Sequence, residues 1–175
     1  GRLANGVGLD TPASTLNILN WLAEAGVELG PESRPDESQA LMAQLLSGRS
    51  NDPESFHLQP LAYLPLNHYL RWWGELTREA RSMIERRWGS PDQAVDLEDK
   101  GLAAHGSLFG HVAVLIQPSR GYDPDQIRDL HSPDLPPPHR YLAQYLWLQE
   151  VHGTQLMVHV GKHGSAEWLP GKSVG

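Results

Sequence analysis

The side chains best suited to chemistry gather near the end of the sequence, in GKHGSAEWLPGKSVG at 161–175. Imidazole and carboxylate groups, here His163 and Glu167, suit borderline divalent metals, and either can act as a base near neutral pH. Glycine on both sides of Lys162 and His163 lets the backbone approach a flat ligand closely. The spacing alone favours a strand-to-helix turn with solvated polar groups, because it is not the HExxH pattern of metalloproteases.

Two other residues could bind a ligand. Arg120 lies between an apolar run and Gly121, where a guanidinium can pair with a carboxylate or an amide oxygen. An ordinary turn arginine fits that position equally well. His139 follows three prolines at an expected helix start, and its role stays open on these grounds.

The composition excludes several kinds of protein. The 175 residues suit one ordinary domain, and the 39% of hydrophobic residues can form a core. The absence of cysteine excludes disulfides, a thiolate zinc site and a cysteine nucleophile. The net charge of −7 argues against nucleic-acid binding, and no apolar run approaches the roughly 20 residues that span a bilayer. We therefore expect a cytoplasmic chain with no nucleic-acid partner and no membrane span.

Helices joined by long loops are expected in the N-terminal part of the chain. Asp10 can cap a first helix, and Pro12 fits its first turn because proline lacks the N–H group. Thr77 can cap the second half of a long helical stretch. Apolar residues at helical spacing predict helices over 10–26, 36–47 and 67–88, and loops are predicted over 48–65 and 89–106.

The C-terminal part predicts a strand, a helix and a second strand. The run 111–117 is apolar and β-branched, as in a buried strand, and a second apolar run covers 155–160. A helix over 141–153 separates them. Such crossovers connect parallel strands, whose C-terminal loops share the sheet edge where ligands bind. We therefore expect the loops 117–122 and 161–164 to lie at one edge.

These elements predict a single α/β segment over 1–175, a layered fold with parallel strands. Residues 1–106 are expected to be mainly helical with long loops, and 107–175 to form the βαβ unit that carries the site loops. The sequence has no initiator methionine and ends within a loop at Gly175, so we expect an internal piece of a longer chain. The glycines at 6 and 8 lack the lysine of a phosphate-binding loop, so ATP binding is not predicted here.

Four sequence blocks resemble a known family. The order and spacing of the blocks are similar to those of cobaltochelatase large subunits of the CobN type and, less closely, of magnesium-chelatase H subunits. The GxHGxxExxPGK block is long and specific, whereas the region 27–107 is not distinctive. The blocks are LDTPAS at 9–14, QPSRGY at 117–122, SPDLPPPHRYLAQYLWL at 132–148 and VHVGKHGSAEWLPGK at 158–172.

Details of these blocks favour the cobalt branch of the family. Trp168 and Leu169 follow Glu167 where the magnesium branch usually carries Phe-Met. Lys162 stands where threonine is frequent in the magnesium branch. The resemblance thus implies insertion of Co²⁺, as substrate metal, into hydrogenobyrinic acid a,c-diamide in cobalamin biosynthesis. ATP would be hydrolysed by separate AAA+ ATPase subunits. The alternatives are a segment that inserts Mg²⁺ into protoporphyrin IX, and a non-catalytic docking segment for the AAA+ partners.

The chemistry of metal insertion, with both loops expected at one sheet edge, suggests roles for individual residues. Glu167 is expected to be the acid/base or metal-handling carboxylate, and His163 its partner or a metal ligand. The expected substrate-binding residues, which would contact the tetrapyrrole, are Arg120, Lys162, Lys172, Gln117, Tyr122 and His139.

Overall fold

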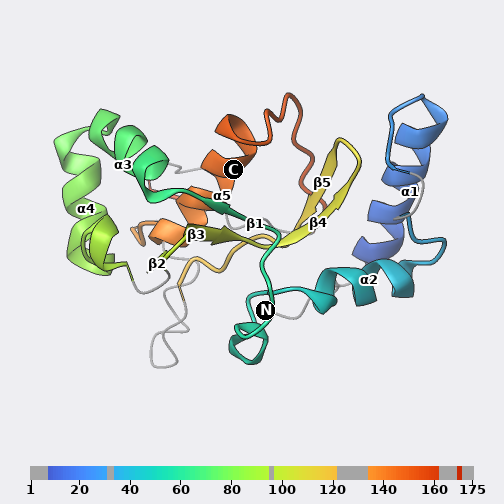
Figure 1. Ribbon diagram of the computed structural model, residues 1–175, viewed down its shortest axis with the longest axis horizontal. Helices are drawn as coiled ribbons and strands as arrows, with labels where there is room; N and C mark the ends of the chain where they lie inside the picture. Colours follow the sequence, from blue (N-terminus) through green and yellow to red (C-terminus); the bar gives the residue numbers. More distant parts are fainter. Residues whose placement is uncertain (1–7, 31–33, 95–96, 122–133, 162–168, 171–175) are drawn as a thin grey trace. The chain divides into compact units, whose positions relative to one another are not determined.

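The computed structural model describes residues 8–30, 34–94, 97–121, 134–161 and 169–170. By their contacts, the described residues form two compact units. Of the described residues, the first unit takes those within 8–61, 105–116 and 158–161, and the second takes those within 62–104, 117–157 and 169–170. The helices and strands (Figure 1) are α1 (Thr11–Glu24), α2 (Ser38–Ser47), β1 (Ala62–Leu64), α3 (Leu66–Glu75), α4 (Arg78–Trp88), β2 (Leu97–Glu98), β3 (Gly101–Ala104), β4 (Gly106–Phe109), β5 (Val112–Leu115) and α5 (His139–Glu150).

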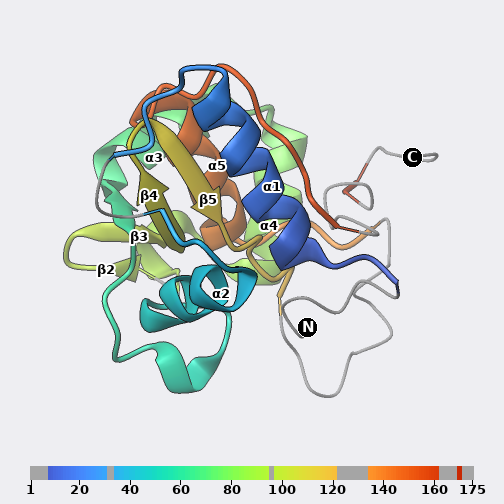
Figure 2. The ribbon, with the colours of Figure 1, turned by 90° about the vertical axis from the view of Figure 1, so that its right-hand side faces the viewer.

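The first unit packs α1 and α2 together with the antiparallel hairpin β4–β5 (Figure 2). Asp10 Oδ1 accepts a hydrogen bond of 2.9 Å from the amide of Ala13, so the predicted cap of α1 is confirmed. Gly26 has φ +90°, a conformation that suits the glycine expected after a helix end. The core of this unit consists of Leu16, Leu19, Leu29, Leu41, Leu45, Phe109 and Ile116.

The second unit contains a three-stranded antiparallel sheet in the order β1-β3-β2. All four residues of β3 are buried, and α5 packs against β3 and β1 (Figure 1). The long predicted helix is divided into α3 and α4 as expected, because the Thr77 hydroxyl caps the Ala80 amide at 3.2 Å. This sheet lay in stretches that the sequence predicts as loops, since strands of two to four residues carry no clear alternation.

The mixture of helices and small sheets confirms the α/β prediction, but the parallel βαβ unit is wrong. The described strands pair only in antiparallel fashion, and β5 pairs with the preceding β4 instead of a strand after α5. Gly110, with φ +55°, allows the tight reversal between β4 and β5 that the apolar pattern could not reveal. Residues 155–160 form no strand, and Leu156 is 79% exposed. The expectation that the loops 117–122 and 161–164 share one sheet edge therefore loses the parallel strands on which it was based.

None of the helices in the described part of the chain is long and apolar enough to cross a membrane.

Gly101 at the start of β3 provides a stability test. It has φ +121°, and an added Cβ would lie 2.8 Å from the carbonyl carbon of Leu64 in β1. We expect Gly101→Ala to lower the free energy of unfolding by about 3 kcal/mol or more, since backbone strain and overpacking combine. Gly153→Ala is the matched control, because Gly153 also has positive φ (+71°) but open space around it. Urea unfolding should show a loss of only about 1–2 kcal/mol for the control. Equal losses would contradict the close approach of β1 to residue 101.

Candidate functional site

Arg120 is turned into the second unit. Its side chain is 2% exposed, and Nη2 donates a hydrogen bond to the backbone carbonyl of Leu135. Burial lowers the pKa of Arg120, and the nearby Tyr141 opposes that effect. A guanidinium keeps its proton in proteins, so a buried cation here needs acceptors around it. Arg120 therefore fixes the turn after Gln117 to a segment fifteen residues further along the chain.

Gln117 binds to α5 through two phenol groups. Its amide Nε2 donates to the Tyr145 hydroxyl at 3.0 Å and to the Tyr141 hydroxyl at 3.4 Å. The two tyrosine rings follow each other by one helical turn, with their centroids 5.1 Å apart. Burial raises the pKa of Tyr145, and its hydrogen bond with Tyr141 adds to the rise, whereas the bond from Gln117 lowers it. Tyr145 thus stays protonated at neutral pH.

His139 is the first residue of α5, and it is 2% exposed. Its Nε2 lies 2.9 Å from the carbonyl oxygen of Gly89, and its Nδ1 lies 2.8 Å from the hydroxyl of Tyr69. Because a carbonyl oxygen can only accept, Nε2 carries the proton, and in the neutral ring Nδ1 accepts from Tyr69. Burial raises the pKa of Tyr69, so the hydroxyl remains a donor. Both ring nitrogens of His139 are therefore engaged by protein atoms.

Trp88, the last residue of α4, joins the same group of segments. Its Nε1 donates a 2.8 Å hydrogen bond to the carbonyl of Pro136. Its ring occupies the place where a Cβ at residue 121 would stand, and Gly121 has φ +113°. The guanidinium of Arg87 lies 4.6 Å above the Trp88 ring centroid. The end of α4, the turn at 120–121 and the segment 135–139 thus form one connected group of side-chain contacts.

Sequence reasoning missed Trp88 and Tyr69 as partners of the candidate residues. The helical pattern assigns Trp88 only to an apolar stripe. A usable signal was the run Pro136-Pro137-Pro138, since prolines offer carbonyl acceptors without N–H donors. Buried indole N–H and phenol O–H groups seek such acceptors or an imidazole nitrogen.

The other candidate residues are not among those that the structure describes. Tyr122, Lys162, His163, Glu167 and Lys172 lie outside the described residues. Within the described ranges, no group of three or more His, Asp or Glu side chains could hold a metal ion. The described part of the site therefore consists of Gln117, Arg120 and His139 with their partners.

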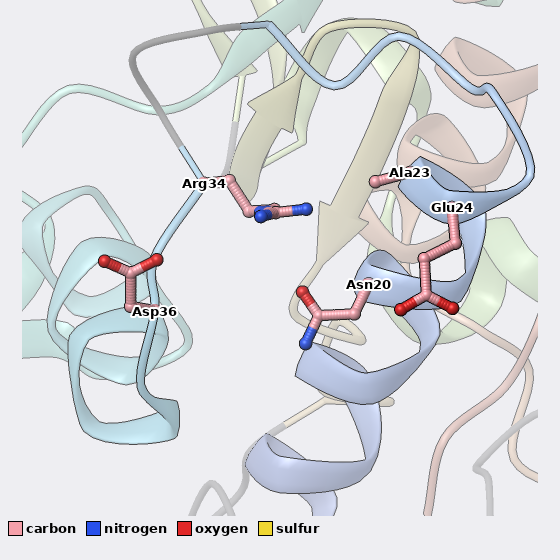
Figure 3. Close-up of a pocket in the computed structure, with 5 residues that line it drawn as sticks. All are labelled: Asn20, Ala23, Glu24, Arg34 and Asp36. Atoms are coloured by element: carbon pink, nitrogen blue, oxygen red, sulfur yellow. The ribbon is translucent and has the colours of Figure 1, made fainter.

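A polar recess of about 510 Å³ lies in the first unit, away from these residues in sequence. It is lined by Asn20, Ala23 and Glu24 of α1 and by Arg34 and Asp36 of the segment before α2 (Figure 3). The Arg34 guanidinium points toward α1, whereas the Asp36 carboxylate is directed away from it. The two carboxylates do not converge, so this recess offers no cation site.

Comparison with known proteins identifies the family. The family model described as CobN/Magnesium Chelatase matches residues 1–175. The chain belongs to this family. The aerobic cobaltochelatase subunit CobN of Pseudomonas aeruginosa is 45% identical over 100% of this chain, and that of a Sinorhizobium species is 41% identical over 99%. The magnesium-chelatase subunit ChlH of rice is 29% identical over 100% of this chain.

A solved structure agrees with this assignment. The catalytic subunit of cobaltochelatase from Mycobacterium tuberculosis is 32% identical and superimposes with a TM-score of 0.76 over 96% of this chain. This chain spans 15% of that protein and 12 to 14% of the three relatives named above.

Tyr69 gives a test of the buried histidine contacts. Tyr69→Phe leaves Nδ1 of His139 buried without its donor, and we expect a loss of about 1–3 kcal/mol in the free energy of unfolding. Tyr63→Phe is the control, because the Tyr63 hydroxyl bonds to Glu98 at 2.9 Å in a more accessible position. It should lose about 1 kcal/mol or less in the same urea titration. A smaller loss at Tyr69 than at Tyr63 would contradict the assigned bond.

The buried phenols predict how stability depends on alkaline pH. Their pKa values are raised in the folded state, while unfolded tyrosines ionise near pH 10. The stability that these phenols contribute is therefore fully present below about pH 10. It falls above that pH, because the unfolded chain then releases protons that the folded chain retains. Urea midpoints measured between about pH 9 and pH 11 should fall less steeply for Tyr145→Phe than for the native chain. An unchanged slope would mean that Tyr145 ionises as freely when folded.

Proposed function

We propose that this chain forms part of the tetrapyrrole-binding, metal-inserting region of an ATP-dependent cobaltochelatase. The supporting observation is the match to two aerobic cobaltochelatase subunits at 45% and 41% identity along the chain, against 29% for a magnesium-chelatase subunit. The proposed substrates are Co²⁺ and hydrogenobyrinic acid a,c-diamide. In this proposal separate AAA+ subunits in the cytoplasm hydrolyse the ATP.

The reaction defines what the residues must do. When a divalent metal enters the macrocycle, the inner N–H groups lose their protons as the metal–nitrogen bonds form. A corrin such as hydrogenobyrinic acid a,c-diamide releases one proton, and a porphyrin releases two. A base must accept those protons, and ligands must hold the metal while it loses its water. A carboxylate near an imidazole meets both needs. We assign the acid/base or metal-handling role to Glu167, with His163 as its partner or a metal ligand.

Cations and amides serve the periphery of the substrate. The tetrapyrrole carries carboxylate and amide groups at its edge, and guanidinium and ammonium groups pair with such oxygens. We assign this anchoring to Arg120, Lys162 and Lys172, assisted by Gln117 and Tyr122. His139 has both ring nitrogens bonded within the protein, so its proposed contribution is to position the start of α5.

Magnesium-chelatase chemistry is the second candidate. Its support is the 29% identity to rice ChlH over the whole chain. The fold and the anchoring roles would be the same for Mg²⁺ and protoporphyrin IX, and only the metal and the macrocycle would differ. Insertion assays that offer each metal with each tetrapyrrole to the full-length subunit and its partners separate the two candidates.

Glu167→Gln tests the catalytic assignment. The amide cannot accept the ring protons, so we expect metal insertion by the full-length subunit with its partners to fall by about 100-fold or more. Tetrapyrrole affinity, measured by absorbance titration, should stay near the native value. Glu150→Gln at the exposed end of α5 is the matched control and should insert metal at the native rate.

Two results would count against the assignment. Insertion at the native rate with normal tetrapyrrole affinity would exclude a catalytic role for Glu167. Loss of subunit assembly with unchanged tetrapyrrole binding would favour a docking segment for the AAA+ partners. Co-sedimentation of the variant with its partner subunits distinguishes this second result.

A further inference from the structure

In the buried segment Leu135–Pro138, the three prolines can form backbone hydrogen bonds only through their carbonyl groups. Prolines have no N–H, so this segment cannot join a sheet as a normal strand. Two successive carbonyls, those of Leu135 and Pro136, accept hydrogen bonds from Arg120 and Trp88. Arg120 and Trp88 therefore hold two neighbouring residues of the segment.

Trp88 also contacts the turn that carries Arg120. An added Cβ at Gly121 would overlap its ring, lying 2.7 Å from Cζ2, so the ring packs directly on the backbone of residue 121. Trp88 thus packs on Gly121, which follows Arg120. It also donates to Pro136, which follows Leu135, the acceptor of the Arg120 hydrogen bond. The carbonyl of Gly89, which follows Trp88, receives Nε2 of His139. The end of α4 is consequently tied once to the proline segment, once to the first residue of α5 and once to the turn.

We propose that Trp88 is a positioning residue for tetrapyrrole binding, because it fixes where the buried guanidinium of Arg120 lies. The inference rests on the proposed function, in which Arg120 anchors the edge of the substrate. Trp88 touches no reacting atom in this account. It fixes the direction of the residue 121 backbone and the location of the Leu135 carbonyl, and these two determine where the guanidinium can lie.

Trp88→Phe in the full-length subunit tests the inference. Phenylalanine keeps an aromatic ring but loses the indole N–H and the outer ring edge that packs on Gly121. We expect the Kd for the tetrapyrrole and the KM to rise about tenfold while kcat changes little. The free energy of unfolding should fall by about 1–3 kcal/mol, because the buried Pro136 carbonyl loses its donor, so binding is measured at a temperature where the variant stays folded. Trp72→Phe is the matched control, since it makes the same replacement at a half-buried tryptophan of α3 and should leave Kd and KM unchanged.

Arg120→Gln separates the inference from the function on which it rests. If Arg120→Gln weakens tetrapyrrole binding and Trp88→Phe does not, the positioning role is wrong and the anchoring role stands. If Arg120→Gln binds the tetrapyrrole as tightly as the native subunit, the anchoring role is wrong and the inference fails with it. Loss of binding in both variants, with Trp72→Phe unaffected, is the expected result.

A double-mutant cycle with Gly121→Ala tests the contact itself. The added methyl group should weaken tetrapyrrole binding because it pushes against the Trp88 ring. Trp88→Phe should then cost less affinity in the Gly121→Ala background than in the native subunit, since the smaller ring relieves the overlap. If the two losses in affinity simply add, Trp88 does not act through residue 121 and the inference is overturned.

Discussion

The second unit depends on how the buried proline segment before α5 satisfies its backbone. A carbonyl buried without a donor is costly, and prolines cannot share the problem by pairing as a strand. The donors come from the guanidinium of Arg120 and the indole of Trp88, which lie 15 and 48 residues away in sequence. Because these bonds join distant segments, they fix tertiary structure and not merely local conformation.

The same constraint explains why side chains that suggest chemistry face inward. Arg120 and His139 are both 2% exposed, and each bonds to a backbone carbonyl. Gln117 completes the set by bonding to two tyrosines of α5. Side chains held in this way lose little conformational freedom when a ligand binds, so the turn at 117–121 is organised in advance.

The sequence predicted local features well and long-range pairing poorly. The Asp10 cap, the Thr77 cap and the ends of the N-terminal helices follow from interactions within one helical turn, so short patterns reveal them. The partner of β5 could not be read in this way, because an apolar β-branched run fits a parallel or an antiparallel neighbour. Gly110 decided the matter by allowing a hairpin with Gly106–Phe109, for which the sequence predicted no strand. The roles of Tyr69 and Trp88 were hidden for the same reason, since both depend on bonds that span 48 to 70 residues.

The family assignment does not depend on the parallel strands that proved wrong. Motif blocks are local, and their order along the chain is independent of how strands pair. The proposed chemistry is likewise independent of a shared sheet edge. A tetrapyrrole is a wide, flat molecule that takes its metal at the centre and carries its acid and amide groups at the rim. In the proposed function, an anchor such as Arg120 and a base such as Glu167 would act on different parts of it, so they need not form one cluster.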